Sequence, residues 1–171
     1  TSNITQLINA DVLRNVELYD LALHGLIEAA GKDLSGLPAD VRHQLQFDQS
    51  SAAPYKGEVL LLDAQGAVLA DSSTLTPTRR NFANHDYFQV HQQNPEAGLF
   101  ISRPFKIHCQ CEQVWCIAFS CRVTGPDGEF AGVAVATMRL AYFDQLFSSL
   151  TIGNGNTVNL LNNQGILLAQ Q

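Results

Sequence analysis

The 171-residue sequence lacks an apolar run long enough to cross a bilayer, which takes about 18 residues, and its N-terminus does not resemble a signal peptide. Charged residues are scarce, at 15% of the chain, and ten basic against sixteen acidic residues give a net charge of −6. This balance argues against a general nucleic-acid binder, because such proteins present a basic face. The hydrophobic share of 46% is enough for one folded domain with a sizeable core. A helical pattern of apolar residues is already present at Ile4, and a strand pattern continues to Leu168. We therefore expect a segment cut from a longer protein.

The motifs by which many enzymes are found in sequence are also missing. There is no phosphate-binding glycine loop, no Gly-x-Ser-x-Gly elbow and no His-Glu-x-x-His helix. His108 and Cys109 are neighbours on a predicted strand, so their side chains point to opposite faces and cannot easily share a proton. Three other histidines, His43, His85 and His91, could reach a cysteine only through the fold. We therefore expect the chain itself to be non-catalytic.

All four cysteines, Cys109, Cys111, Cys116 and Cys121, lie within thirteen positions of one another. A secreted disulfide framework spreads its cysteines along the chain, and a zinc site needs a second pair of ligands, whereas only His108 lies close by. Strand periodicity places Cys109 and Cys111 on one face of a single strand, which leaves a local site open. We expect buried or partly buried thiols, with no metal and no cofactor.

The first 30 residues predict one long helix. Apolar residues recur at steps of three and four along one side of it, which is the period of an α-helix: Ile4, Ile8, Val12, Val16, Tyr19, Leu23, Leu26 and Ala30. Leu13, Leu21 and Ile27 broaden this stripe, so one side can pack on a domain while another meets a partner helix. The helix is roughly 40 Å long, more than a small domain covers, and we expect a homodimer through it. A shorter helix is expected from Pro38.

After Pro54 the periodicity changes to that of strands, with a helix predicted near residues 85–93 and another over 140–150. The predicted strands cover residues 58–63, 67–70, 99–102, 105–109, 114–123 and 130–138. We expect the α+β class, with a central antiparallel sheet of about five strands. Residues 58–70 and 157–169 are identical at seven of thirteen positions, at a constant offset of 99. An opening hairpin therefore recurs, as if a second, truncated unit began near residue 156.

Several stretches, in this order and spacing, resemble the double Cache (PAS-like, PDC) extracytoplasmic sensor domains of bacterial transmembrane receptors, most of all those of membrane-bound diguanylate cyclases. Sensors of histidine kinases and chemoreceptors are near relatives. The resemblance covers essentially the whole chain and rests on Leu62–Gly66, Asn81–Phe88, Gly98–Ser102, Trp115–Ser120, Gly128–Val133 and Leu140–Phe147.

The resemblance implies three parts: an N-terminal helical part (1–52), a membrane-distal ligand-binding unit (53–150) and the opening hairpin of a membrane-proximal unit (151–171). It also implies a periplasmic segment tethered to the inner membrane, which binds a small molecule and signals to a cytoplasmic output domain. A diguanylate cyclase output is expected first. A histidine kinase or chemoreceptor is the alternative, and so is a module that binds nothing and only spaces the helices.

Cache domains that bind amino acids use Arg-x-Trp-Tyr for the carboxylate and a late-strand Asp for the ammonium. Here these positions hold the stretch 85–88, with His in place of Arg, and Thr137. We therefore expect a small anionic or neutral ligand rather than an α-amino acid. The expected ligand residues are Arg79, Arg80, Phe82, His85, Tyr87, Phe88, Ser102, Ser120 and Thr137. Simple solvation of the two arginines and core packing of Tyr87 and Phe88 are the structural alternatives.

Overall fold

The computed structural model describes residues 2–47, 56–109, 112–148 and 157–170. Its helices are α1 (Ser2–Ala30), α2 (Ala39–Phe47), α3 (Asp86–Gln93) and α4 (Ala141–Ser148). Its strands are β1 (Lys56–Asp63), β2 (Val68–Asp71), β3 (Phe100–Ile101), β4 (Phe105–Cys109), β5 (Glu112–Thr124), β6 (Phe130–Arg139), β7 (Asn159–Leu161) and β8 (Leu167–Gln170).

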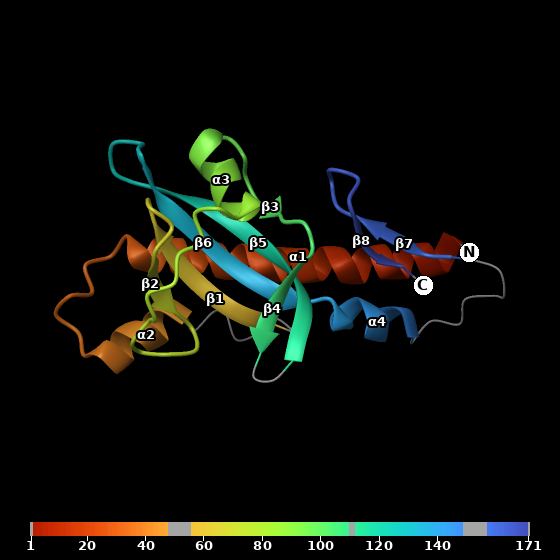
Figure 1. Ribbon diagram of the computed structural model, residues 1–171, viewed down its shortest axis with the longest axis horizontal. Helices are drawn as coiled ribbons and strands as arrows, with labels where there is room; N and C mark the ends of the chain where they lie inside the picture. Colours follow the sequence, from red (N-terminus) through yellow and green to blue (C-terminus); the bar gives the residue numbers. More distant parts are fainter. Residues whose placement is uncertain (1, 48–55, 110–111, 149–156, 171) are drawn as a thin grey trace.

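Six strands form one antiparallel sheet in the order β2-β1-β6-β5-β3, in which β4 also pairs with β5. Strands β7 and β8 form a separate two-stranded sheet beside α4 and the start of α1 (Figure 1). The predicted α+β class, the long helix and the antiparallel sheet are confirmed, with six strands in the main sheet instead of about five. None of the helices among the described residues is long and apolar enough to span a membrane.

The long helix α1 lies along one face of the sheet (Figure 1). Alternate strand residues such as Leu61 and Phe119 point to this face, as the period of two requires. Tyr19 of α1 stacks on Phe119, with ring centres 4.5 Å apart. Leu23 is fully buried, and Val16 packs against the same cluster. The apolar stripe of α1 is therefore filled by the chain's own sheet.

The opposite face of the sheet is covered by α3. Leu60, Leu62 and Val135 point to this face and pack with Phe88 of α3. Because both faces are covered, β6 is buried almost along its whole length, as its apolar composition predicts. The ligand residues expected from sequence lie on this second face or in the loop before it.

The sequence suggested that Cys109 and Cys111 share one face of a single strand. Strand β4 ends at Cys109, which pairs with Glu112, the first residue of β5. The chain therefore reverses direction between these two strands. Cys111 itself lies outside the described residues.

The two hairpins of the sequence repeat have the same turn. In the first, Asp63 Oδ1 accepts hydrogen bonds from the amides of Gln65 and Ala67, both at 2.9 Å. Asn162 does the same in the second hairpin, 99 positions later, with the amides of Gln164 and Ile166 at 3.0 and 2.9 Å. A glycine with positive φ follows at the same place in each, at 81° and 76°. The repeat is therefore one of geometry as well as of sequence.

Candidate ligand site

The tip of the β1–β2 hairpin holds the loop that leads into α3. The carbonyl of Gly66 accepts a hydrogen bond from the Phe82 amide at 2.8 Å, and Ala67 forms a bridge with Asn81. Gly66 has a φ of +81°, and a Cβ there would lie 2.6 Å from the Ala83 nitrogen. Only glycine therefore allows this close approach. The hairpin thus fixes where residues 79–85 lie relative to the sheet.

Arg80 is held in this loop by two carboxylates. Its Nη1 donates to Glu58 Oε2 at 2.8 Å, and its Nη2 donates to Asp71 Oδ2 at 2.7 Å. Asp71 is only 2% exposed and also accepts hydrogen bonds from Ser73. Burial alone would lower the pKa of Arg80, but its hydrogen bonds with Glu58 and the charges of both carboxylates raise it. The guanidinium therefore stays charged, and the two carboxylates together carry more negative charge than its single positive charge.

One donor of Arg80 is left over. Its Nε is buried and has no hydrogen-bond partner among the described residues. A buried N–H without an acceptor costs about 1–3 kcal/mol, so this atom favours an acceptor brought from outside.

One aromatic ring lies against Arg80, and three more form a connected group with that ring. Its guanidinium carbon is 5.5 Å from the centre of the Phe82 ring. His85 stacks on Tyr87 at 4.8 Å, and Phe105 of β4 lies within 6.0 Å of both rings. Burial lowers the pKa of His85, and burial together with the charges of Asp86 and Glu58 raises the pKa of the Tyr87 phenol. Both side chains are therefore neutral at physiological pH, and the group forms a mostly uncharged wall.

Two of the expected ligand residues do not join this group. Arg79 is exposed, although it directly precedes Arg80. Phe88 is 1% exposed and packs edge-on against Phe130 at 5.5 Å, so it belongs to the core under α3.

Two of the expected polar residues satisfy backbone groups. Ser102 Oγ accepts from the Ala118 amide and donates to the Arg103 carbonyl, both at 2.8 Å. Thr137 Oγ1 donates to the Glu58 carbonyl at 3.2 Å. Both side chains are buried. Thr137 therefore lies on β6, directly beside the part of β1 that carries Glu58, the carboxylate partner of Arg80.

The third, Ser120, bonds to a histidine that was not among the expected ligand residues. Nε2 of His91 lies 2.9 Å from Ser120 Oγ. His91 is fully buried, and its Nδ1 has no partner among the described residues. Burial lowers its pKa, so the ring is neutral. His91 follows Phe88 by three residues and Tyr87 by four, so all three lie on the inner face of α3. The helical period of the sequence could therefore have placed His91 there.

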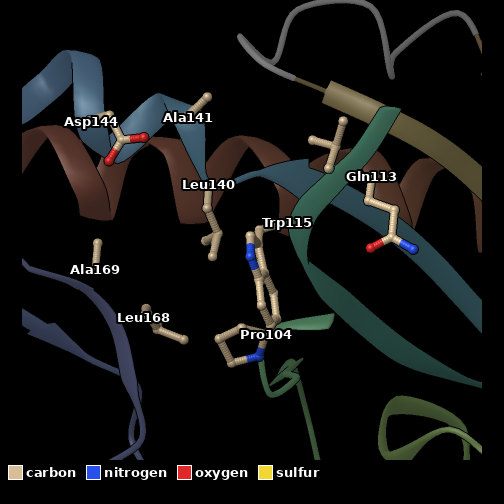
Figure 2. Close-up of a pocket in the computed structure, with 9 residues that line it drawn as sticks. Pro104, Gln113, Trp115, Leu140, Ala141, Asp144, Leu168 and Ala169 are labelled. Carbon is tan, nitrogen blue, oxygen red and sulfur yellow. The ribbon is translucent and has the colours of Figure 1, made fainter. Parts of the chain in front are cut away.

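A separate cavity of about 490 Å³ lies at the junction of the main sheet, α4 and β8 (Figure 2). The Trp115 side chain of β5 lines this cavity and lies near Pro104, Leu140 and Leu168 (Figure 2). Trp115 is 51% exposed, and the Lys106 ammonium lies 4.9 Å from its ring centre. This cavity is largely apolar, and none of the ligand residues expected from sequence lines it.

Neither a family model nor a curated protein matches the sequence. Solved structures do match, among them the extracellular domain of rpHK1S-Z16, which is assigned as a histidine kinase: the TM-score is 0.78 and the identity 26%, over 98% of this chain and 68% of that one. The ligand-binding domain of the Pseudomonas aeruginosa amino-acid chemoreceptor PctC, in complex with GABA, matches with a TM-score of 0.65 and 19% identity. The match covers 97% of this chain and 72% of that one. The periplasmic sensory domain of the Campylobacter jejuni chemoreceptor Tlp1 matches with a TM-score of 0.60 and 13% identity, over 98% of this chain and 72% of that one. The chain has the fold of extracellular sensor domains of histidine kinases and chemoreceptors.

Proposed function

We propose that the chain is the extracytoplasmic sensor segment of a transmembrane receptor, and that it binds a small ligand between the sheet and residues 79–88. The unmet Nε donor of Arg80 carries this proposal. The Arg80 guanidinium lies over Phe82, and the partly buried His85 ring packs next to Phe82, so these two rings supply apolar contact for a ligand with one polar end. The fold shared with sensor domains supports the same conclusion.

The ligand is a neutral molecule with an acceptor oxygen, or an anion that accepts at Arg80. A neutral acceptor fits better, because Glu58 and Asp71 already balance the guanidinium and would repel a further carboxylate. The bound amino acid in the PctC structure shows that this fold accepts ligands of that size. The replacement of Arg by His85 in the amino-acid motif still argues against an α-amino acid here.

The wider receptor follows from the resemblance to Cache (PAS-like) sensors. In such a receptor, residues 53–150 form the membrane-distal unit and residues 1–52 form the helical part before it. Residues 151–171 form the start of a membrane-proximal unit. The segment lies in the periplasm and is anchored in the inner membrane. The output is a diguanylate cyclase, with a histidine kinase or chemoreceptor as the alternative.

Dimerisation through α1 uses the side of the helix away from the sheet. The stripe through Leu23 is filled within the chain, so it does not supply the seam. Leu7, Leu13 and Leu21 are 67%, 51% and 63% exposed, and at 100° per residue they centre opposite the buried stripe. These leucines are the apolar surface that a second α1 would cover.

A thermal-shift screen against neutral and anionic metabolites tests the ligand site, since a ligand of the folded state raises stability. Arg80→Lys keeps a positive charge between the two carboxylates but removes the Nε donor. We expect a ligand that raises the thermal midpoint of the wild type to bind Arg80→Lys at least tenfold more weakly. This is a loss of about 1.4 kcal/mol in binding free energy. The matched control Arg79→Lys changes the exposed neighbour and should bind as the wild type does. Equal affinity of both variants would place the ligand elsewhere, and a screen without any ligand would favour the spacer alternative.

A further inference from the structure

Three potential metal ligands meet where α1 crosses β5. Asp20 and His24 are one helical turn apart on α1, and Cys121 comes from β5. One donor atom from each lies within 4.8 Å of the other two. Cys121 is a buried free thiol, while the side chains of Asp20 and His24 are 41% and 64% exposed. The buried thiol thus faces two ligands that can be reached from solvent.

The two ligand distances that involve Asp20 are close to those of a tetrahedral zinc site. Zinc binds nitrogen and carboxylate oxygen at about 2.1 Å and thiolate at about 2.3 Å, so neighbouring ligands of a tetrahedron lie about 3.4 Å apart for N and O and about 3.6 Å for S and O. His24 Nδ1 lies 3.2 Å from Asp20 Oδ1, and Cys121 Sγ lies 3.8 Å from the same oxygen. Shifts of a few tenths of an ångström, well within side-chain rotation, would complete these two edges.

The cluster has room for a fourth ligand. A surface pocket of about 340 Å³ is lined by His24 and Cys121, together with Leu99 and Gly98 from the loop before β3. A cation held by three protein ligands at its edge would keep one position for water or an exchangeable group, the arrangement of open zinc sites.

The charges of the cluster suit a divalent cation. Asp20 and a Cys121 thiolate together carry two negative charges, which balance Zn²⁺, and His24 coordinates as a neutral ring. Without metal the Cys121 thiol donates a hydrogen bond to Asp20 Oδ1 at 3.8 Å. The incoming cation replaces that proton, which passes to solvent. It also replaces the hydrogen bond of His24 Nδ1 to the Asp20 carbonyl, at 2.9 Å.

We propose that Asp20, His24 and Cys121 form a zinc site that ties α1 to β5. Thiolate and imidazole favour zinc over magnesium or calcium, which prefer oxygen ligands. The site is separate from the Arg80 group, because α1 covers the opposite face of the sheet from α3. A cation there would fix the long helix against the sheet independently of any ligand at Arg80.

The test titrates the metal-free, reduced 171-residue chain with Co²⁺ as a spectroscopic substitute for Zn²⁺. We expect one Co²⁺ per chain, with a thiolate-to-cobalt band in the near ultraviolet that Zn²⁺ erases. Cys121→Ser should remove this band. His24→Gln, which alters an exposed side chain, should keep the fold and weaken Co²⁺ binding at least about tenfold.

Two controls replace cysteines and a histidine that lie outside the proposed site. The double variant Cys109→Ser/Cys111→Ser and the variant His43→Gln should both retain the band and the wild-type affinity. The proposal is overturned if the wild type shows no thiolate band, if the band survives Cys121→Ser, if His24→Gln binds Co²⁺ with the wild-type affinity, or if the band disappears in the Cys109→Ser/Cys111→Ser variant. Added Zn²⁺ should also raise the thermal midpoint of the wild type more than that of His24→Gln.

Discussion

Replacing Arg80 by alanine should destabilise the fold, because this side chain pairs with the buried carboxylate of Asp71 at the end of β2. Asp71 is 2% exposed, and its Oδ2 accepts from Arg80 at 2.7 Å. Breaking a buried ion pair costs about 3–5 kcal/mol when one charge is left unpaired. Asp71 would keep its two hydrogen bonds from Ser73, and Glu58, which is half-exposed, would be rehydrated. We therefore expect a loss of about 2–3 kcal/mol.

Urea unfolding followed by circular dichroism measures this loss against Arg79→Ala, the exposed neighbour, which should change stability by less than about 0.5 kcal/mol. Adding Asp71→Asn to Arg80→Ala removes the unpaired charge, so the double variant should be more stable than Arg80→Ala alone. If Arg80→Ala unfolds within 0.5 kcal/mol of the wild type, the ion pair is not formed in solution and the argument from it fails.

Three further predictions concern the core, the buried histidine and the long helix. Gly132→Ala should cost more than about 2 kcal/mol in urea unfolding, since its φ is +150° and a Cβ would lie 1.9 Å from a β1 carbonyl. The control Gly128→Ala, at φ +82° with open space around it, should cost only about 1 kcal/mol. Stability should fall below about pH 6.5, because the buried His91 resists the proton that the unfolded chain accepts, and His91→Gln should flatten this slope by up to about 1.4 kcal/mol per pH unit. Leu13→Glu should weaken association in sedimentation at unchanged stability, whereas Leu23→Glu should unfold the chain; equal effects of the two would refute the assignment of the faces.

The local periodicities of the sequence predicted the elements correctly, and the reason is physical. The phase of apolar residues in α1 is set by the face it must bury, so Tyr19 and Leu23 could be placed without a structure. The same reasoning could not decide whether that stripe met the domain or a second helix. Only the area of the sheet that α1 covers decides this, and it is a property of the assembled chain.

The partners of Arg80 were missed because they depend on strand register. Leu60 pairs with Asp71 across the hairpin, so Glu58, two residues earlier, points to the same side of the sheet as Asp71. Both carboxylates thus converge on one loop cation. The turn Asp63–Gly66 was visible in the sequence, but the bulge between Leu61 and Leu62 that shifts the register was not. Charge pairs across a hairpin therefore lie at the limit of what a single sequence can show.

The two faces of the sheet are connected by the strands themselves. In β6, Thr137 bonds to the backbone beside the Arg80 group, while its neighbours Ala136 and Met138 pack toward α1. One residue, Leu140, separates β6 from α4, and its amide donates to the Trp115 carbonyl at 2.9 Å.

Helix α4 is in turn bonded to α1. Tyr142 Oη donates to Asp11 Oδ2 and accepts from Asn15 Nδ2, each at 2.6 Å. A ligand that shifts β6 therefore acts on both helices through packed and hydrogen-bonded contacts. It can bias them only by the difference in its affinity for the two arrangements.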